Sequence, residues 1–389
     1  KENISSLSIV NQRETIVIWD KETGEPIINA LVWQCNRSAE ICKSLIEDGF
    51  EEIIQDNTGL KIDNYFSGPK IKWVFDNYDV IEKSNIVIGT IDTWLIWNLT
   101  NREVFATEPS NASRTLLYNI HKQGWDKKLC EIFNVSRVML PEILSSNSNF
   151  GFYEGIPIVG VMGDSQAALY GHKLTKRGDV KATLGTGCSI LMNNGENSEV
   201  ENSTIIQTVA WKKNNNISYA LEGVIKSCTD TLNWLQNELN LFNTIDEGSE
   251  IAAPFWETNT KASFIGMTRS STKEHLIRAA FDSIVFQIKA VIDEMEKETQ
   301  IKIGSIKVDG GASKNSDLIQ LMSDVLQKKI ITEEVEELSA LGILMLSFDV
   351  DIYRKYQQIF KPKTNKEHFY FDWLEHVKNY LNIERKKLL

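Results

Sequence analysis

The stretch that decides the fold reads Val159-Gly160-Val161-Met162-Gly163-Asp164-Ser165-Gln166-Ala167-Ala168-Leu169-Tyr170-Gly171. A short apolar run ends at Gly163, and a helix of small residues is expected to follow it. This order places the carboxylate of Asp164 at the end of a buried strand, where the chain turns and a ligand can approach. An aspartate at a helix start is also a common N-cap, so Asp164 is a helix cap, a functional acid, or both.

Two glycine turns later in the chain favour the functional interpretation. Gly185-Thr186-Gly187 follows an apolar run, and Gly310-Gly311-Ala312 lies between an expected strand and an expected helix. Glycine lets backbone N–H groups approach phosphate oxygens, and a helix N-terminus favours negative charge. Either segment could instead be a plain hairpin or packing turn. One acid and two such turns indicate a nucleotide enzyme in which Asp164 accepts a proton during phosphate transfer.

Arg13 and Glu14 are adjacent and lie between two expected strands. In the simpler interpretation they form a solvated surface pair. In the alternative they project into a cleft, where a fork of donors and an acceptor hold the hydroxyl groups of a polyol. The aromatic pair Tyr65-Phe66 is expected in the core.

From Gly151 onward, short apolar runs alternate with glycine turns and helical patterns, which is typical of an α/β protein. We expect a strand over 7–10, a hairpin of 16–19 with 26–28, and helices over 38–47, 70–77, 92–99, 316–327, 340–344 and much of the tail from 361. The clearest helix should begin with a capping box of Ser271 and Glu274. The best domain boundary lies between 171 and 178.

The composition is that of a globular protein with room for two domains. The chain has 389 residues, of which 42% are hydrophobic and 24% charged. Its net charge of −11 argues against nucleic acid or an anionic membrane as the main partner. The five cysteines lack metal-ligand spacing, which indicates reduced thiols and no metal site. No apolar run approaches a membrane span and no signal peptide is evident, so we expect a cytoplasmic protein.

Together these motifs resemble the FGGY family of carbohydrate kinases, over about residues 9–362. The segments that carry the resemblance are 11–15, 65–77, 89–95, 111–115, 262–267, 275–276 and 279–282. Segments 11–15, 89–95 and 111–115 are most similar to the members of the family that phosphorylate glycerol. The resemblance implies an α/β fold of two actin-like ATPase (ribonuclease H-like) domains around a central cleft. Residues 1–172 would form the substrate domain and 173–389 the nucleotide domain.

The resemblance also implies the activity and the site. The expected reaction is transfer of the γ-phosphoryl group of ATP to a terminal hydroxyl of a small polyol, glycerol first of all, giving sn-glycerol 3-phosphate. The polyol would be held by Arg13, Glu14, Tyr65, Asp164 and Ser165, with Asp164 as general base. The nucleotide would be held by Gly185, Thr186, Thr229, Asn233, Gly310, Gly311 and Asn315. Mg²⁺ would bridge the β- and γ-phosphates, with no metal-ligating side chain assigned. Homo-oligomers are common in the family.

Several departures from the family pattern leave alternatives open. Ser165 stands where a glutamine is usual, and its shorter side chain leaves room for a longer polyol or a ketose. Cys35, Thr229 and Asn233 replace the usual aspartate, glycine and glutamine. The Asp-x-Gly-Thr phosphate hairpin that opens the family pattern does not occur in the sequence, and a glycine-rich stretch before 253 is also missing. We therefore expect the first domain to be N-terminally incomplete, with segments omitted from the sequence. The alternative is a truncated actin-like protein without catalytic activity.

Overall fold

The computed structural model describes residues 4–78, 85–199, 205–225, 228–229, 237, 266–333, 337–352 and 357–387. Contacts between residues divide the chain into two compact units. Unit 1 consists of Lys1–Arg177, Asn193–Leu221 and Glu337–Ile352, and unit 2 of Gly178–Met192, Glu222–Glu336 and Tyr353–Leu389. Strands β11 (Cys188–Gly195) and β13 (Asn216–Ile225) have residues in both units.

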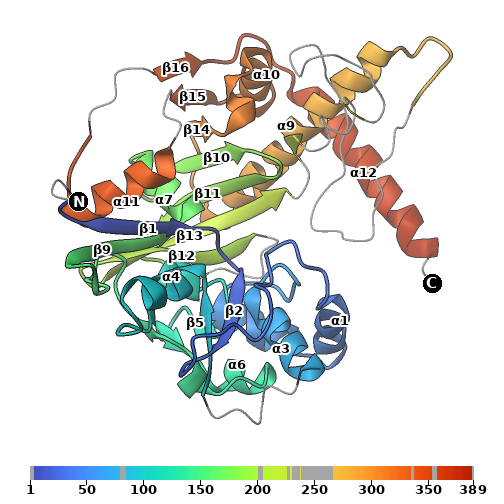
Figure 1. The fold of residues 1–389 in the computed structure, drawn as a ribbon. Coiled ribbons are helices and arrows are strands. Elements are labelled where there is room, and N and C mark those ends of the chain that lie inside the picture. Colours follow the sequence, from blue (N-terminus) through green and yellow to red (C-terminus); the bar gives the residue numbers. More distant parts are fainter. Residues whose placement is uncertain are drawn as a thin grey trace. The chain divides into compact units, whose positions relative to one another are not determined.

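The sheet that positions the candidate site of unit 1 has the strand order β1-β9-β8. Figure 1 labels its strands β1 and β9. Strand β1 (Leu7–Asn11) runs parallel to β9 (Ile156–Gly163), and β8 (Phe152–Tyr153) is antiparallel to β9. At the carboxyl ends of the parallel pair, Asn11 is the register partner of Gly163. Ligands of open α/β sheets bind outside the carboxyl ends of such strands, so the segments that follow both residues are placed for a site.

The apolar residues of β1 and β9 form one core with the helix and loops that cover them. Its buried members are Ile9, Ile96, Ala106, Phe150, Ile158 and Val161. Burying each large side chain of this kind contributes about 1.5–3 kcal/mol relative to leaving it exposed. The strand expected over 7–10 and the helix expected over 92–99 are confirmed as β1 and α4 (Ile91–Leu99), because both supply apolar residues to this core.

Strand β2 (Ile16–Asp20) pairs antiparallel with β3 (Ile86–Thr90) over its whole length. Trp19 also forms an antiparallel bridge with Pro26, and the N–H of Ile27 donates to the carbonyl of Ile18 at 2.9 Å. The predicted hairpin is therefore present in a short form, whereas the prediction missed β3, the main partner of β2. The five residues of β3 are all buried, and pairing with them covers β2 with a second apolar strand that the short local loop cannot provide.

The remaining helices and strands of unit 1 surround these sheets. The helices are α1 (Ala39–Glu47), α2 (Glu51–Thr58), α3 (Ser67–Asn77), α5 (Pro109–Ala112), α6 (Lys127–Ile132), η1 (Arg137–Met139), α7 (Asp164–Gly171) and α11 (Leu338–Phe348). The strands are β4 (Ala106–Thr107), β5 (Tyr118–Asn119), β6 (Gly124–Trp125), β7 (Glu142–Ile143) and β12 (Ile206–Lys213). Helices α7 and α11 pack very closely, and this is possible because Gly342 of α11 has no Cβ. A Cβ at this position would clash with the carbonyl of Ala167 in α7. The helices expected over 38–47, 70–77 and 340–344 correspond to α1, α3 and α11.

Unit 2 contains strands in the order β11-β10-β14-β15-β16 (Figure 1). Strands β10 (Val180–Leu184), β14 (Ser305–Asp309) and β15 (Lys329–Glu333) are parallel neighbours, and β16 (Gln357–Phe360) is antiparallel to β15. The helices described in this unit are α9 (Lys273–Thr299), η3 (Gly311–Lys314), α10 (Ser316–Leu326) and α12 (Glu367–Lys387). The helices expected over 316–327 and in the tail are confirmed as α10 and α12.

The cap of α9 differs from the predicted one. The N-cap is Thr272, and its backbone N–H donates to Nδ1 of His275, 3.1 Å away. Ser271 lies one residue before the cap, so the predicted box of Ser271 and Glu274 is wrong by one position. No helix in the described parts of either unit is long and apolar enough to cross a membrane.

Candidate functional site

A strained turn after β1 presents the first two candidate residues. Glu14 has φ +63°, a backbone conformation uncommon outside glycine, and the N–H of Thr15 donates to the carbonyl of Arg13 at 2.7 Å across it. The hydroxyl of Ser67 donates to the carbonyl of Glu14 at 3.1 Å and supports the turn. Such conformations persist only where the surroundings hold them, and they cluster at functional sites.

Two arginines meet the carboxylate of Glu14, and both are buried. Nε of Arg114 donates to Oε1 of Glu14 at 2.6 Å, with the Arg114 and Glu14 side chains 0% and 2% exposed. Nε of Arg13 lies 3.9 Å from the same oxygen, and the Arg13 side chain is 4% exposed. The interpretation of Arg13 and Glu14 as a solvated surface pair is therefore wrong.

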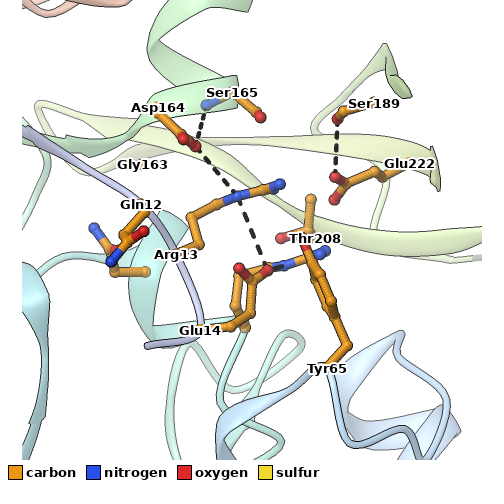
Figure 2. A network of polar contacts seen from close by, with 12 residues as sticks. Gln12, Arg13, Glu14, Tyr65, Gly163, Asp164, Ser165, Ser189, Thr208 and Glu222 are labelled. Atoms are coloured by element: carbon orange, nitrogen blue, oxygen red, sulfur yellow. Dashed lines mark hydrogen bonds and ion pairs between the residues drawn. The ribbon is translucent and has the colours of Figure 1, made fainter. Parts of the chain in front are cut away.

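Arg13 also reaches the acid that follows β9. Its Nε lies 3.6 Å from Oδ1 of Asp164, so the guanidinium lies between the carboxylates of Glu14 and Asp164 (Figure 2). Gly163 makes this approach possible, because a Cβ at Gly163 would lie 2.8 Å from Cγ of Arg13. The two candidate segments, 13–14 and 163–165, are thus in contact.

Asp164 is the first residue of α7, and Gly163 occupies the N-cap position. The helix-cap interpretation is therefore wrong about the position, although Oδ1 of Asp164 accepts the N–H of Ser165 at 2.7 Å. The Asp164 side chain is 48% exposed, unlike those of Arg13 and Glu14. Among the described residues, Oδ1 makes both side-chain contacts and Oδ2 makes none. Asp164 thus offers one free carboxylate oxygen on a buried support.

Tyr65 and Ser165 are half-buried and lie next to these groups. The ring of Tyr65 is 5.8 Å from Cζ of Arg114, and Ser165 directly follows Asp164 in α7 (Figure 2). The backbone carbonyl of Tyr65 accepts a hydrogen bond from Nζ of Lys70. Burial lowers the pKa of Lys70 to about 8. A buried cation therefore holds the backbone that carries the Tyr65 ring.

Arg114 was not predicted as a site residue, although it lies in segment 111–115. The sequence indicated the role of Arg114 only indirectly. A buried Glu14 requires a cation, and Arg114 supplies it from 100 residues away. Because sequence spacing does not reveal such long-range pairs, only the folded chain identifies this contact.

In unit 2, Gly185-Thr186-Gly187 forms the loop of a hairpin. Leu184 of β10 pairs with Cys188 of β11 in an antiparallel register, so the hairpin interpretation of this turn is confirmed. The loop is also tied to a distant segment: the hydroxyl of Thr229 donates to the carbonyl of Gly185 at 2.8 Å. Thr186 is exposed at the tip of this loop. An exposed threonine between two glycines remains a candidate phosphate contact.

The second glycine turn lies beside the first one. Strands β10 and β14 are parallel neighbours with Thr183 opposite Asp309, so the two turns follow adjacent strands. Gly310 has φ +91°, and a Cβ there would lie 2.4 Å from the carbonyl oxygen of Leu184. Gly311 is exposed. The close approach explains why a glycine is needed at position 310.

The last two residues predicted on the nucleotide side are Asn315 and Asn233. Asn315 is the N-cap of α10, and its side-chain oxygen accepts the N–H of Leu318 at 2.9 Å. Asn233 lies outside the described residues. The structure therefore groups Gly185, Thr186, Thr229, Gly310 and Gly311 in unit 2, and places Asn315 at the start of the helix that follows.

Comparisons with known proteins agree with this architecture. The sequence model of the FGGY family of carbohydrate kinases, N-terminal domain, matches residues 1–171, and that of the C-terminal domain matches residues 240–348. Glycerol kinase 2 of Thermotoga maritima is 40% identical, over 99% of this chain and 86% of that protein. Glycerol kinase of Thermoanaerobacter sp. is 41% identical, over 95% of this chain and 80% of that protein.

Solved structures show the same fold. Plasmodium falciparum glycerol kinase with ADP superposes with a TM-score of 0.88 at 32% identity, covering 97% of this chain and 84% of that one. Xylulose kinase from Lactobacillus acidophilus has a TM-score of 0.83 at 18% identity, covering 98% and 84%, and supports the fold alone. The expected α/β fold of two actin-like ATPase domains is confirmed by these relationships. The chain therefore belongs to the FGGY family of carbohydrate kinases.

Proposed function

We propose that this chain is a glycerol kinase, which transfers the γ-phosphoryl group of ATP to a terminal hydroxyl of glycerol and gives sn-glycerol 3-phosphate. The observation that carries the proposal is the contact of Arg13 with Asp164 at the carboxyl ends of β1 and β9. Relatives named glycerol kinase, at about 40% identity over most of the chain, support the choice of substrate.

Asp164 is the general base in this proposal. Its half-exposed carboxylate has Oδ2 available, so it can accept the proton of a substrate hydroxyl as that oxygen attacks phosphorus. Oδ1 is fixed by the N–H of Ser165 and by the guanidinium of Arg13, which orients the free oxygen. A base positioned in this way accelerates proton transfer by about 10²–10⁴-fold.

Arg13, Glu14, Tyr65 and Ser165 hold the polyol. Guanidinium N–H groups donate to hydroxyl oxygens, and the Glu14 carboxylate accepts hydroxyl protons. The side chains of Arg13 and Glu14 are buried and paired with each other, so they lose little conformational entropy when a substrate binds. Tyr65 provides an apolar face for the carbon chain.

Residues 173–389 act as the nucleotide domain, and residues 1–172 as the substrate domain. We assign the ATP phosphates to Gly185, Thr186 and Thr229, and the nucleoside end to Gly310, Gly311, Asn315 and Asn233. Two neighbouring turns of nearly bare backbone fit an anion, because glycine permits close approach of N–H groups. The ADP named with the Plasmodium falciparum enzyme supports a nucleotide of this type.

Mg²⁺ enters with the nucleotide in this proposal. No cluster of three metal-ligating side chains occurs within the ranges that the structure describes. Mg²⁺ retains several waters and is bound mainly through substrate phosphates, so we expect it to bind as the Mg-ATP complex. When bound, the ion offsets negative charge on the β- and γ-phosphates.

Ser165 favours a second candidate, a kinase of a longer polyol or a ketose. It follows the base directly and is half-buried, so its small side chain shapes the space beside Asp164. The test is a screen of glycerol, erythritol, xylulose and ribulose with Mg-ATP, with the phosphorylated product identified by mass spectrometry. Turnover of glycerol supports the first proposal. Turnover of only a longer substrate supports the second proposal. If the protein neither turns over any of these substrates nor binds ATP, it is non-catalytic.

A further inference from the structure

Glu108 is a buried carboxylate whose hydrogen bonds, within the described ranges, go to residues outside the candidate site. It is the N-cap of α5 and is 0% exposed. Its two oxygens accept hydrogen bonds from five donors. These are the N–H of Ser110 (2.9 Å), the hydroxyl of Ser110, the N–H of Asn111 (2.8 Å), Nδ2 of Asn111 (3.0 Å) and the hydroxyl of Ser146 (2.8 Å). Capping a four-residue helix accounts for only the two backbone donors.

One branch of this network leads to Asp164. The hydroxyl of Ser110 has a single proton, which it donates to Glu108, so its oxygen is directed at other donors. That oxygen accepts the N–H of Gly163 at 2.8 Å. Gly163 ends β9 and is the N-cap of α7, directly before Asp164. Through Ser110, the carboxylate thus holds the Met162–Gly163 peptide, one peptide before the candidate base.

The other branch leads to Arg13. Nδ2 of Asn111 donates to Glu108 and to Oδ1 of Asn11 (3.1 Å), while Nδ2 of Asn11 donates back to Oδ1 of Asn111 (2.8 Å). Since a carboxylate accepts only, Glu108 determines which end of the Asn111 amide faces Asn11. Nδ2 of Asn11 also donates to the carbonyl of Gln12 at 2.9 Å, in the peptide directly before Arg13.

We propose that Glu108 is the positioning residue of the site: through Ser110 and Asn111 it aligns the two strand ends that carry Asp164 and Arg13. The inference rests on the proposed function, in which these two residues act on the substrate. Glu108 acts in this way in its ionised form, which only accepts hydrogen bonds and is the main form above about pH 7. Hydrogen bonds to a charged acceptor are about twice as strong as neutral ones, and a buried, connected network strengthens its members. One carboxylate can therefore hold both segments in register.

The variants Glu108→Gln and Ser110→Ala separate positioning from simple stability. Each Glu108 oxygen accepts a backbone N–H whose direction cannot reverse, so the amide of a glutamine would face a donor in either orientation. Ser110→Ala removes only the branch to Gly163. Ser113→Ala is a matched control, because Ser113 is also fully buried beside α5 but bonds to Thr208 and Val209 of β12. Its hydroxyl also donates to the backbone carbonyl of Ser110 at 3.4 Å, but it does not contact the Ser110 hydroxyl that holds Gly163.

The first measurement is independent of activity. Hydrogen exchange of the Gly163 amide should become about fivefold faster or more in Ser110→Ala, since its hydrogen bond is lost, and should be unchanged in Ser113→Ala. The second measurement is steady-state kinetics of phosphoryl transfer to glycerol. Glu108→Gln and Ser110→Ala should each lower kcat about tenfold or more, with a smaller change in KM, because small displacements of a base act on the transition state. Ser113→Ala should stay within about twofold of the wild type in both measurements.

The outcomes distinguish the two proposals. Gly163 exchange that is unchanged in Ser110→Ala overturns the positioning role, as does a kcat equal to that of Ser113→Ala in an active protein. If the wild type transfers no phosphoryl group to any polyol, the proposed function fails, and the Gly163 exchange rate then decides the positioning role alone. If Glu108→Gln does not fold, the exchange rate and kcat of Ser110→Ala test the positioning role.

Discussion

Asn11 and Gly163 are register partners at the last position of the parallel strands β1 and β9. The chain leaves the sheet directly after each of them, toward Arg13 on one side and Asp164 on the other. This pairing brings an arginine and an aspartate that are 151 positions apart in sequence within 3.6 Å, measured from Nε to Oδ1. The candidate site is therefore a consequence of strand pairing, and its geometry depends on how precisely these two ends are held.

Asp164→Asn should lower kcat by about 10²–10⁴-fold with a smaller effect on KM. An asparagine keeps the size of the side chain but cannot accept the substrate proton. The measurement is initial rates of ADP release with glycerol and Mg-ATP. Asp351→Asn is the control, because this exposed carboxylate forms a surface ion pair with Lys173, away from the candidate site. Equal rates for the two variants would contradict the assignment of Asp164 as base.

Gly163→Ala should reduce activity about tenfold or more, because a Cβ there would lie 2.8 Å from Cγ and 2.9 Å from Cδ of Arg13 and displace the arginine. Gly124→Ala is the matched control, since the nearest atom to a Cβ at Gly124 is 3.9 Å away. Crystal structures or kinetics of both variants test the expectation. Full activity of Gly163→Ala would mean that the position of Arg13 does not matter for turnover.

Glu14→Gln should destabilise the protein by about 3 kcal/mol, because it leaves the guanidinium of Arg114 buried without its carboxylate. The side chains of this pair are 0% and 2% exposed, so water cannot replace the lost charge. Urea unfolding measures the difference. Glu131→Gln is the control: its partner Lys127 is at the surface, and the loss should stay below about 1 kcal/mol. Similar losses in the two variants would refute the buried-pair argument.

Glu108 should make the stability of the protein depend on pH. Burial raises its pKa from 4.5 to about 7, with Asp92 adding to the rise and hydrogen bonds from Ser110 and Ser146 opposing it. Tyr118 also faces Glu108, and its pKa is raised by burial and by this carboxyl group. Between pH 4.5 and 7 the folded state retains a proton that the unfolded state has released. The free energy of unfolding should therefore fall as pH rises through this window, by about 3 kcal/mol in total from this group.

Urea midpoints of the wild type and Glu108→Gln, compared between pH 5 and 8, check this expectation. The glutamine does not titrate, so the stability of the wild type relative to the variant should decrease from pH 5 to 7 and then level off. A difference that stays constant across the range would show that Glu108 does not titrate there.

The local features of this fold were predictable from the sequence, whereas its long-range contacts were not. The apolar run before Gly163 and the small residues after Asp164 specify a strand followed by a helix, which the structure contains as β9 and α7. Strand β2 was predicted at the correct residues and with its short local partner at 26–28, but without its main partner β3. Hydrophobic periodicity identifies a strand, yet the distant apolar strand β3 determines what β2 pairs with.

The same limit applies to the candidate site. Asp164, Arg13 and Glu14 could be proposed from their neighbours in sequence and from a family resemblance. Arg114 and Glu108 could not, since their roles depend on partners that only the folded chain brings together. Only the observed burial of Arg13 and Glu14 shows that they are not a surface pair, because two adjacent charged residues in a sequence predict solvent exposure.

Gly310→Ala should weaken nucleotide binding, because the turn after β14 has no room for a side chain. At φ +91° an alanine is strained, and its Cβ would lie 2.4 Å from the carbonyl oxygen of Leu184, directly before the Gly185 loop. The backbone must shift, and both proposed nucleotide-binding turns shift with it. Calorimetry with Mg-ATP should show an affinity about tenfold lower or weaker still, while Gly304→Ala, which meets no neighbour within 4 Å, should bind as the wild type does. Unchanged affinity in Gly310→Ala would move the proposed nucleotide site away from these turns, because a ligand contacting them must sense a displacement of the backbone that holds it.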